Sequence, residues 1–209
     1  MEEQRSRSTH LTGLLLAVVA GLALGALAKI ADQSSIHELS QIGTQLGLWV
    51  VVLTITSVTA PSRPMAALRG TLLMTAMVFA YYAATYLYFR VISPLDIVVW
   101  GLLAVTGVPV IAMLLQPARG DGLPAALATA LPVGLLAAEA FGFRYRVTLY
   151  AAPLVFDSVA LALLLWVLPR NNAMRIKAAA LAVPFGFLGH WMMTDGFGIV
   201  VGYLRRGFG

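Results

Sequence analysis

Apolar runs of about twenty residues follow one another along almost the whole chain, with only short breaks between them. A helix of that length matches the thickness of a bilayer and satisfies its own backbone N–H and C=O groups inside lipid. The pattern therefore predicts an all-α, polytopic transmembrane helical bundle with six or seven spans. The predicted spans are residues 11–30, 42–60, 70–89, 95–116, 123–142, 148–168 and a final run from 178 to 204.

Charged residues are too few to cover a water-facing surface. They make up 11% of the 209 residues, and 60% of the residues are hydrophobic. A soluble domain has about 25% charged residues. No soluble linker separates the runs, so we expect residues 1–209 to form a single membrane-embedded helical domain whose main partner is the lipid bilayer.

The formal charge of +5 does not indicate a nucleic-acid partner, because the basic residues stand as ones and twos at the ends of apolar runs. We expect a multi-pass protein of the inner (plasma) membrane with a cytoplasmic N-terminus. The positive-inside rule favours six spans, since a final run that does not cross keeps Arg205 and Arg206 in the cytoplasm. The apolar length of that run favours seven.

Small residues recur at every fourth position of the first run, at Gly13, Ala17, Gly21 and Gly25. Residues at i and i+4 share one helix face, so this small-residue stripe allows another backbone to approach closely. Two interpretations stay open. The stripe packs against a helix of the same chain, or it docks onto a partner membrane subunit or a second copy.

Four residues with acidic or imidazole side chains lie inside the later runs: Glu139, Asp157, His190 and Asp195. A charge at membrane depth is costly and usually faces a cavity or a partner. Glu139, near the end of its run, belongs to an interfacial ion pair or to a ligand site. Asp157, near the middle of its run, belongs to a structural network or binds a ligand or proton. We also predict a contact between Asp157 and His190.

Four tyrosines lie within the eight residues from Tyr81 to Tyr88. Tyr82 and Tyr86 share one helix face, and Tyr81 and Tyr88 share another. One interpretation is an aromatic belt at the membrane surface. The other is an outward-opening pocket, lined by tyrosines and carboxylates, that binds a small molecule.

Common catalytic signatures are absent from the sequence, including G-x-S-x-G, H-E-x-x-H, the P-loop and G-x-G-x-x-G. The chain has no cysteine, and its three histidines are far apart in sequence. We therefore expect no cofactor and no metal, and we rank a membrane enzyme centred on His190 behind the other functions.

Several short motifs carry a family resemblance. They are the glycine-rich first run, Trp49, Arg63-Pro64, Ala67-Leu68-Arg69-Gly70, Tyr81-Tyr82, Trp100 with Gly107-Val108-Pro109, and Ala138-Glu139. In these the chain is similar, over about residues 11–145, to a family of small uncharacterised bacterial multi-spanning membrane proteins, a domain of unknown function. That resemblance implies a multi-spanning membrane protein and brings no established activity.

The expected architecture also resembles the substrate-binding S component of energy-coupling-factor vitamin transporters. The shared features are short helices, a small-residue first helix and an outward-facing pocket. In that family the first-helix stripe docks on the transmembrane coupling subunit, so the resemblance implies docking through Ala17, Gly21 and Gly25. No vitamin-binding motif is recognisable.

Small-molecule binding or transport in the outer half of the bundle is the leading prediction. The acids would bind a cation or hydrogen-bond a polar ligand, and the tyrosines would stack on it. The predicted ligand-binding residues are Tyr82, Tyr86, Glu139, Asp157 and His190. The alternative is a non-transporting accessory or assembly subunit that docks through the small-residue stripe.

Overall fold

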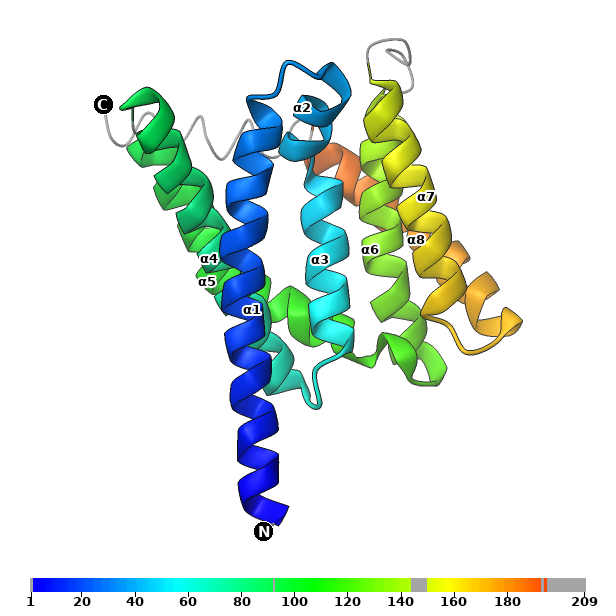
Figure 1. Ribbon diagram of the computed structural model, residues 1–209. Coiled ribbons are helices and arrows are strands. Elements are labelled where there is room, and N and C mark those ends of the chain that lie inside the picture. Colours follow the sequence, from blue (N-terminus) through cyan, green and yellow to red (C-terminus); the bar gives the residue numbers. More distant parts are fainter. Residues whose placement is uncertain (1, 92, 144–149, 193, 195–209) are drawn as a thin grey trace. The chain divides into compact units, whose positions relative to one another are not determined.

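Every regular element that the computed structural model describes is a helix (Figure 1). The description covers residues 2–91, 93–143, 150–192 and 194. The elements are α1 (Glu2–Asp32), α2 (His37–Thr44), α3 (Leu46–Val58), α4 (Arg63–Phe89), α5 (Pro94–Leu115), the 3-10 helix η1 (Gln116–Arg119), α6 (Gly122–Phe143), α7 (Ala151–Val167) and α8 (Asn172–Trp191). An all-α bundle, as the apolar runs predict, is thus confirmed.

The chain divides into two compact units, which are described separately below. Unit 1 is Met1–Pro117 and unit 2 is Ala118–Gly209. In unit 1, α1 packs along α4, α4 also packs on α5 and α3, and α2 packs on α1. In unit 2, α6 packs mainly on α8 and also on α7.

The small-residue stripe of α1 faces α4 of the same chain. A Cβ atom at Gly21 would overlap the carbonyl oxygen of Leu73, and one at Gly25 would overlap that of Met77. Ala17 is 5% exposed, and the Arg69 side chain covers Gly13. The stripe therefore brings the backbones of α1 and α4 into direct contact, which is the first of the two interpretations of this motif.

Polar side chains cap the N-termini of α4 and α8. The Ser62 hydroxyl accepts a hydrogen bond from the Met65 N–H at 3.4 Å, and Pro64 occupies the first turn of α4. The Asn171 side chain likewise accepts a bond from the Met174 N–H at 2.9 Å, ahead of α8. These caps satisfy N–H groups that a helix start leaves without partners.

Four helical stretches among the described residues are long and apolar enough to cross a membrane: Leu11–Asp32, Arg63–Phe89, Pro94–Arg119 and Gly122–Gly142. The bent pair α2 and α3 makes a fifth if it counts as one span. α7 has 17 residues, at the short end of the range of about 17–25 that spans a bilayer. α8 includes Arg175 and Lys177 in its first two turns. Six or seven crossings stay a prediction, and Arg205 and Arg206 lie outside the described residues.

The crossing of α1 and α4 predicts a position-specific effect of alanine. Gly21→Ala lowers the free energy of unfolding by about 1–3 kcal/mol, because the new methyl group overlaps the Leu73 carbonyl. The matched control is Gly101→Ala on α5, where a Cβ would meet no atom within 4 Å. Its stability stays equal or rises by up to ~1 kcal/mol, because alanine is the better helix former. Unfolding in mixed detergent measures both variants, and equal stabilities would contradict the crossing.

Candidate functional site

One end of unit 1 gathers the C-termini of α1 and α4, the N-terminus of α5, and the junction of α2 with α3 (Figure 1). The arrangement follows from connectivity, since α1, the bent pair α2 and α3, α4 and α5 alternate in direction. Residues 33–36 and the end of α4 at Phe89 therefore lie at this same end. Side chains distant in sequence meet here.

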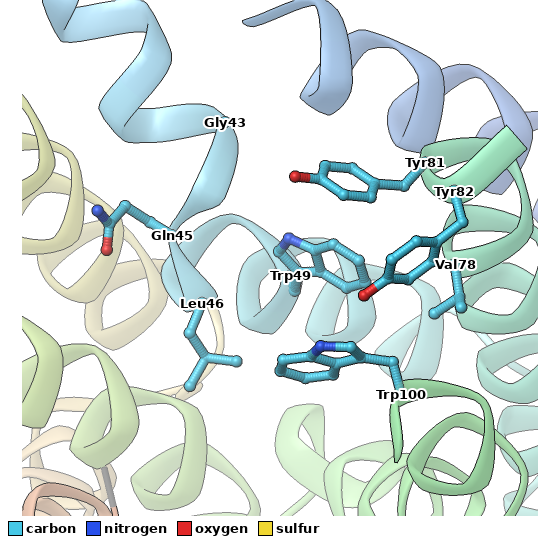
Figure 2. A pocket seen from close by; sticks show the side chains of 8 residues that line it. All are labelled: Gly43, Gln45, Leu46, Trp49, Val78, Tyr81, Tyr82 and Trp100. Carbon is cyan, nitrogen blue, oxygen red and sulfur yellow. The ribbon is translucent and has the colours of Figure 1, made fainter. Parts of the chain in front are cut away.

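A pocket of about 180 Å³ lies at this end of unit 1. Four aromatic side chains dominate its lining, two from α4 and one each from α3 and α5, and Figure 2 shows their rings grouped together. We call this the aromatic pocket. Its lining residues are Gly43, Gln45, Leu46, Trp49, Val78, Tyr81, Tyr82 and Trp100.

The rings of the aromatic pocket pack in two pairs. The centroids of Trp49 and Trp100 are 6.2 Å apart with the planes tilted by 32°. The centroids of Tyr81 and Tyr82 are 5.4 Å apart in an edge-to-face arrangement. Such pairs favour fixed ring orientations, so the pocket wall is held by its own contacts.

A polar network fixes Tyr81 at the edge of the pocket. The Lys29 ammonium group donates to Asp32 Oδ2 at 2.6 Å, and the Tyr81 hydroxyl donates to the same oxygen at 3.2 Å. Lys29 is only 6% exposed, and its ammonium lies 5.0 Å from the centroid of the Tyr81 ring. The charge of Lys29 is thus compensated twice, by a carboxylate and by the face of an aromatic ring.

The junction between α2 and α3 supplies the opposite wall. Gln45 has an extended backbone between the two helices, which differ in direction by 52°. Gly43 precedes the junction, and a Cβ there would come within 2.7 Å of the Ala28 carbonyl oxygen on α1. Close packing of α2 on α1 therefore sets where the helix breaks, and the break admits the side chains of Gln45 and Leu46 to the pocket.

The two tyrosines predicted to share a ligand differ in position. Tyr82 lines the aromatic pocket, whereas Tyr86 is not among its lining residues. Tyr86 is 43% exposed, and the Arg90 guanidinium lies 5.6 Å from its ring centroid. The neighbour that joins Tyr82 at the pocket is Tyr81, from the other predicted pair.

The predicted acids belong to unit 2. Asp157 on α7 is fully buried, and Glu139 on α6 is 8% exposed. The two carboxyl groups lie within electrostatic range of each other. Within the described part of the chain, neither oxygen of Asp157 has a hydrogen-bond partner. The predicted contact of Asp157 with His190 therefore does not include a hydrogen bond. Arg144 and Arg146, which follow Glu139 in the sequence and could form the predicted interfacial ion pair with it, lie outside the described residues.

His190 lines a second cavity, of about 390 Å³, in unit 2. The cavity is walled by apolar residues of α6, α7 and α8, and the His190 ring packs edge-to-face on Phe141 with centroids 5.3 Å apart. Glu139 and Asp157 are not among its lining residues. Three of the five predicted ligand-binding residues thus lie in unit 2 and two in unit 1, and Asp195 lies outside the described residues.

Among the aromatic residues of the pocket, Trp49 and Trp100 had no predicted role. Both appear in the motifs that carry the family resemblance. Because they lie on different helices, α3 and α5, their spacing in the sequence does not show that they are in contact. A wall built from separate helices is visible only in three dimensions. Among the residues that the structure describes, no group of three or more His, Asp or Glu side chains could hold a metal ion.

The chain belongs to a family of unknown function (DUF6518), whose model matches residues 4–199. The predicted resemblance to an uncharacterised family is thus confirmed, and the match extends well beyond residue 145. No match was found among curated proteins or among solved structures.

The surroundings of Asp157 predict the effect of removing its charge. Neither carboxyl oxygen of Asp157 is hydrogen-bonded among the described residues, so replacing the carboxyl by an amide in Asp157→Asn changes the free energy of unfolding by less than about 1 kcal/mol. The matched control on the same helix is Leu164→Ala, which lowers it by about 2–5 kcal/mol because Leu164 is 8% exposed. Detergent unfolding measures both. A loss of about 3–5 kcal/mol in Asp157→Asn would indicate a buried ion pair instead.

Proposed function

We propose that this member of a family of unknown function is a multi-pass protein of the bacterial inner membrane that binds a small molecule in the aromatic pocket of unit 1. The observation that carries the proposal is the pocket itself: four aromatic rings from three helices around about 180 Å³, at the end of unit 1 where a helix is broken. Binding sites combine such apolar walls with a few polar groups, here Gln45 and the tyrosine hydroxyls.

The outward-facing side chains support the membrane location. α5 exposes Leu102, Val105, Val110 and Leu114, each more than half exposed, and α1 exposes Leu15 and Leu16 in the same way. Large contiguous apolar surfaces are rare on soluble proteins and ordinary where lipid covers them. The four or five candidate spans supply the necessary length.

The broken helix supports a binding role for this end. Irregular backbone inside a membrane is tolerated where it lines a cavity, and interrupted spans often mark binding sites. With the N-terminus in the cytoplasm, the end of α1 that carries Lys29 and Asp32 faces outward. The aromatic pocket then opens toward the outer side.

Transport is the second candidate function, and Asp157 is the observation that favours it. A fully buried carboxyl without a hydrogen-bond partner among the described residues contributes no stability, and such groups in membrane proteins accompany proton and ion pathways. Uptake that depends on Asp157 would support this function. The accessory-subunit alternative has less support, because α4 covers the stripe at Gly21 and Gly25.

The absence of cysteine allows a direct test of topology. In intact cells, a membrane-impermeant maleimide labels Ser35→Cys, in the loop after α1, and does not label Ser62→Cys, in the loop before α4. Lysed cells provide the control, in which both variants are labelled. Labelling of both in intact cells would mean that α2 and α3 do not cross together, and labelling of Ser62→Cys alone would reverse the orientation.

Co-purification tests the binding function. Full-length protein purified from native membranes retains a small molecule that mass spectrometry detects, and Tyr82→Leu retains at least about tenfold less, as the loss of one ring contact of ~1.4 kcal/mol implies. Trp191→Phe is the control, since Trp191 is 53% exposed in unit 2. Equal retention by Tyr82→Leu and the control, or no retained molecule in any sample, would contradict binding in the aromatic pocket.

A further inference from the structure

The chemistry of the pocket wall defines what kind of ligand fits. Its largest surfaces are the rings of Trp49, Tyr81, Tyr82 and Trp100, and among the described residues no lysine, arginine or carboxylate lines it. Aromatic faces carry partial negative charge and attract cations, and tryptophan does so more strongly than tyrosine or phenylalanine. An anionic ligand would find no positive charge in the wall.

Lys29 already demonstrates this property at the edge of the pocket. Its ammonium group lies 5.0 Å from the Tyr81 ring centroid and 5.3 Å from that of Phe89. Because Asp32 binds this ammonium at 2.6 Å, the pair adds little net charge to the pocket. The net charge beside the Tyr81 ring is therefore close to zero.

Asp96 adds a negative charge near Tyr82 and Trp100. It lies in the first turn of α5, four residues before Trp100, and within electrostatic range of the Tyr82 hydroxyl. Its carboxylate accepts a hydrogen bond from Ser93 and has no ion-pair partner in the described part of the chain. An uncompensated carboxylate beside an aromatic wall favours a positively charged occupant.

The size of the pocket limits the occupant. A cavity of about 180 Å³ is smaller than the roughly 300–1,000 Å³ of a typical small-molecule pocket, so it suits a small group. A metal ion prefers several oxygen ligands, and this wall offers few. An alkylated ammonium group has suitable size, carries its charge on a weakly hydrated surface, and is the kind of cation that aromatic cages bind.

We propose that the aromatic pocket binds an alkylated ammonium group through the rings of Trp49, Tyr82 and Trp100, with Asp96 attracting the charge. This inference rests on the proposed binding function and names its ligand class. The ammonium group belongs either to a soluble organic cation or to a choline-type lipid headgroup. Both present the same trimethylated nitrogen.

A charge-matched pair of probes tests the ligand class. Full-length protein in nanodiscs of phosphatidylglycerol is titrated calorimetrically with choline and with 3,3-dimethylbutan-1-ol, its uncharged isostere. Choline binds at least about tenfold more tightly, since cation–π contacts of ~1–2 kcal/mol are absent from the isostere. If the isostere binds as tightly as choline, the pocket is merely apolar and the ammonium proposal is wrong, while the binding function stands.

Variants locate the binding site. Trp49→Leu and Trp100→Leu weaken choline binding at least about tenfold, whereas Trp191→Phe leaves it unchanged. Asp96→Asn weakens choline binding severalfold and leaves the isostere unaffected, and Asp121→Asn, in an exposed ion pair of unit 2, is its control. Unchanged choline affinity in both tryptophan-to-leucine variants would overturn the proposal, and circular dichroism checks that the variants are folded.

Lipid composition separates the two sources of the ammonium group. If the natural ligand is a lipid headgroup, nanodiscs that contain phosphatidylcholine block the binding of added choline; if it is a soluble cation, they do not. Either outcome supports the proposal. Failure of choline to bind in phosphatidylglycerol nanodiscs overturns it. The co-purification experiment then decides the wider question: a molecule retained through Tyr82 preserves the binding function, and no retained molecule ends both.

Discussion

Direct contact between the backbones of α1 and α4 determines the rest of unit 1. In lipid, apolar side chains gain little by leaving their surroundings, so close packing has to hold helices together. Gly21 and Gly25 allow it by leaving room for the carbonyl groups of Leu73 and Met77. One consequence lies at the end of the crossing, where Lys29 and Asp32 meet Tyr81 and orient its ring at the aromatic pocket.

The break between α2 and α3 is the second feature that shapes the aromatic pocket. A continuous helix would leave no break in the wall beside α4 and α5. Instead, Gln45 has an extended backbone, and α2 and α3 differ in direction by 52°. Trp49 then reaches Trp100 on one side, and Gly43 rests on α1 on the other. Helix packing and the shape of the aromatic pocket are therefore coupled, because α1, which carries the small-residue stripe, also supports the junction of α2 with α3.

Local sequence signals predicted the helices but not their grouping. The apolar runs placed α4, α5 and α6 to within a few residues, apart from residues 63–69 at the start of α4. The division after residue 117 falls at a break between two apolar runs, but this break resembles the other breaks in the sequence and does not reveal that two units meet there. Of the predicted ligand-binding residues, Tyr82 lines the aromatic pocket. Trp49 and Trp100 could not be paired, since their contact depends on how α3 and α5 pack.

In the proposed function, Trp49, Tyr82 and Trp100 enclose a ligand and do not form a solid aromatic core. A density map of the full-length protein, determined in nanodiscs formed directly from native membranes, distinguishes the two. We expect non-protein density in the aromatic pocket, in contact with the three rings and close to Asp96. Rings packed against one another, with no space or density between them, would contradict it.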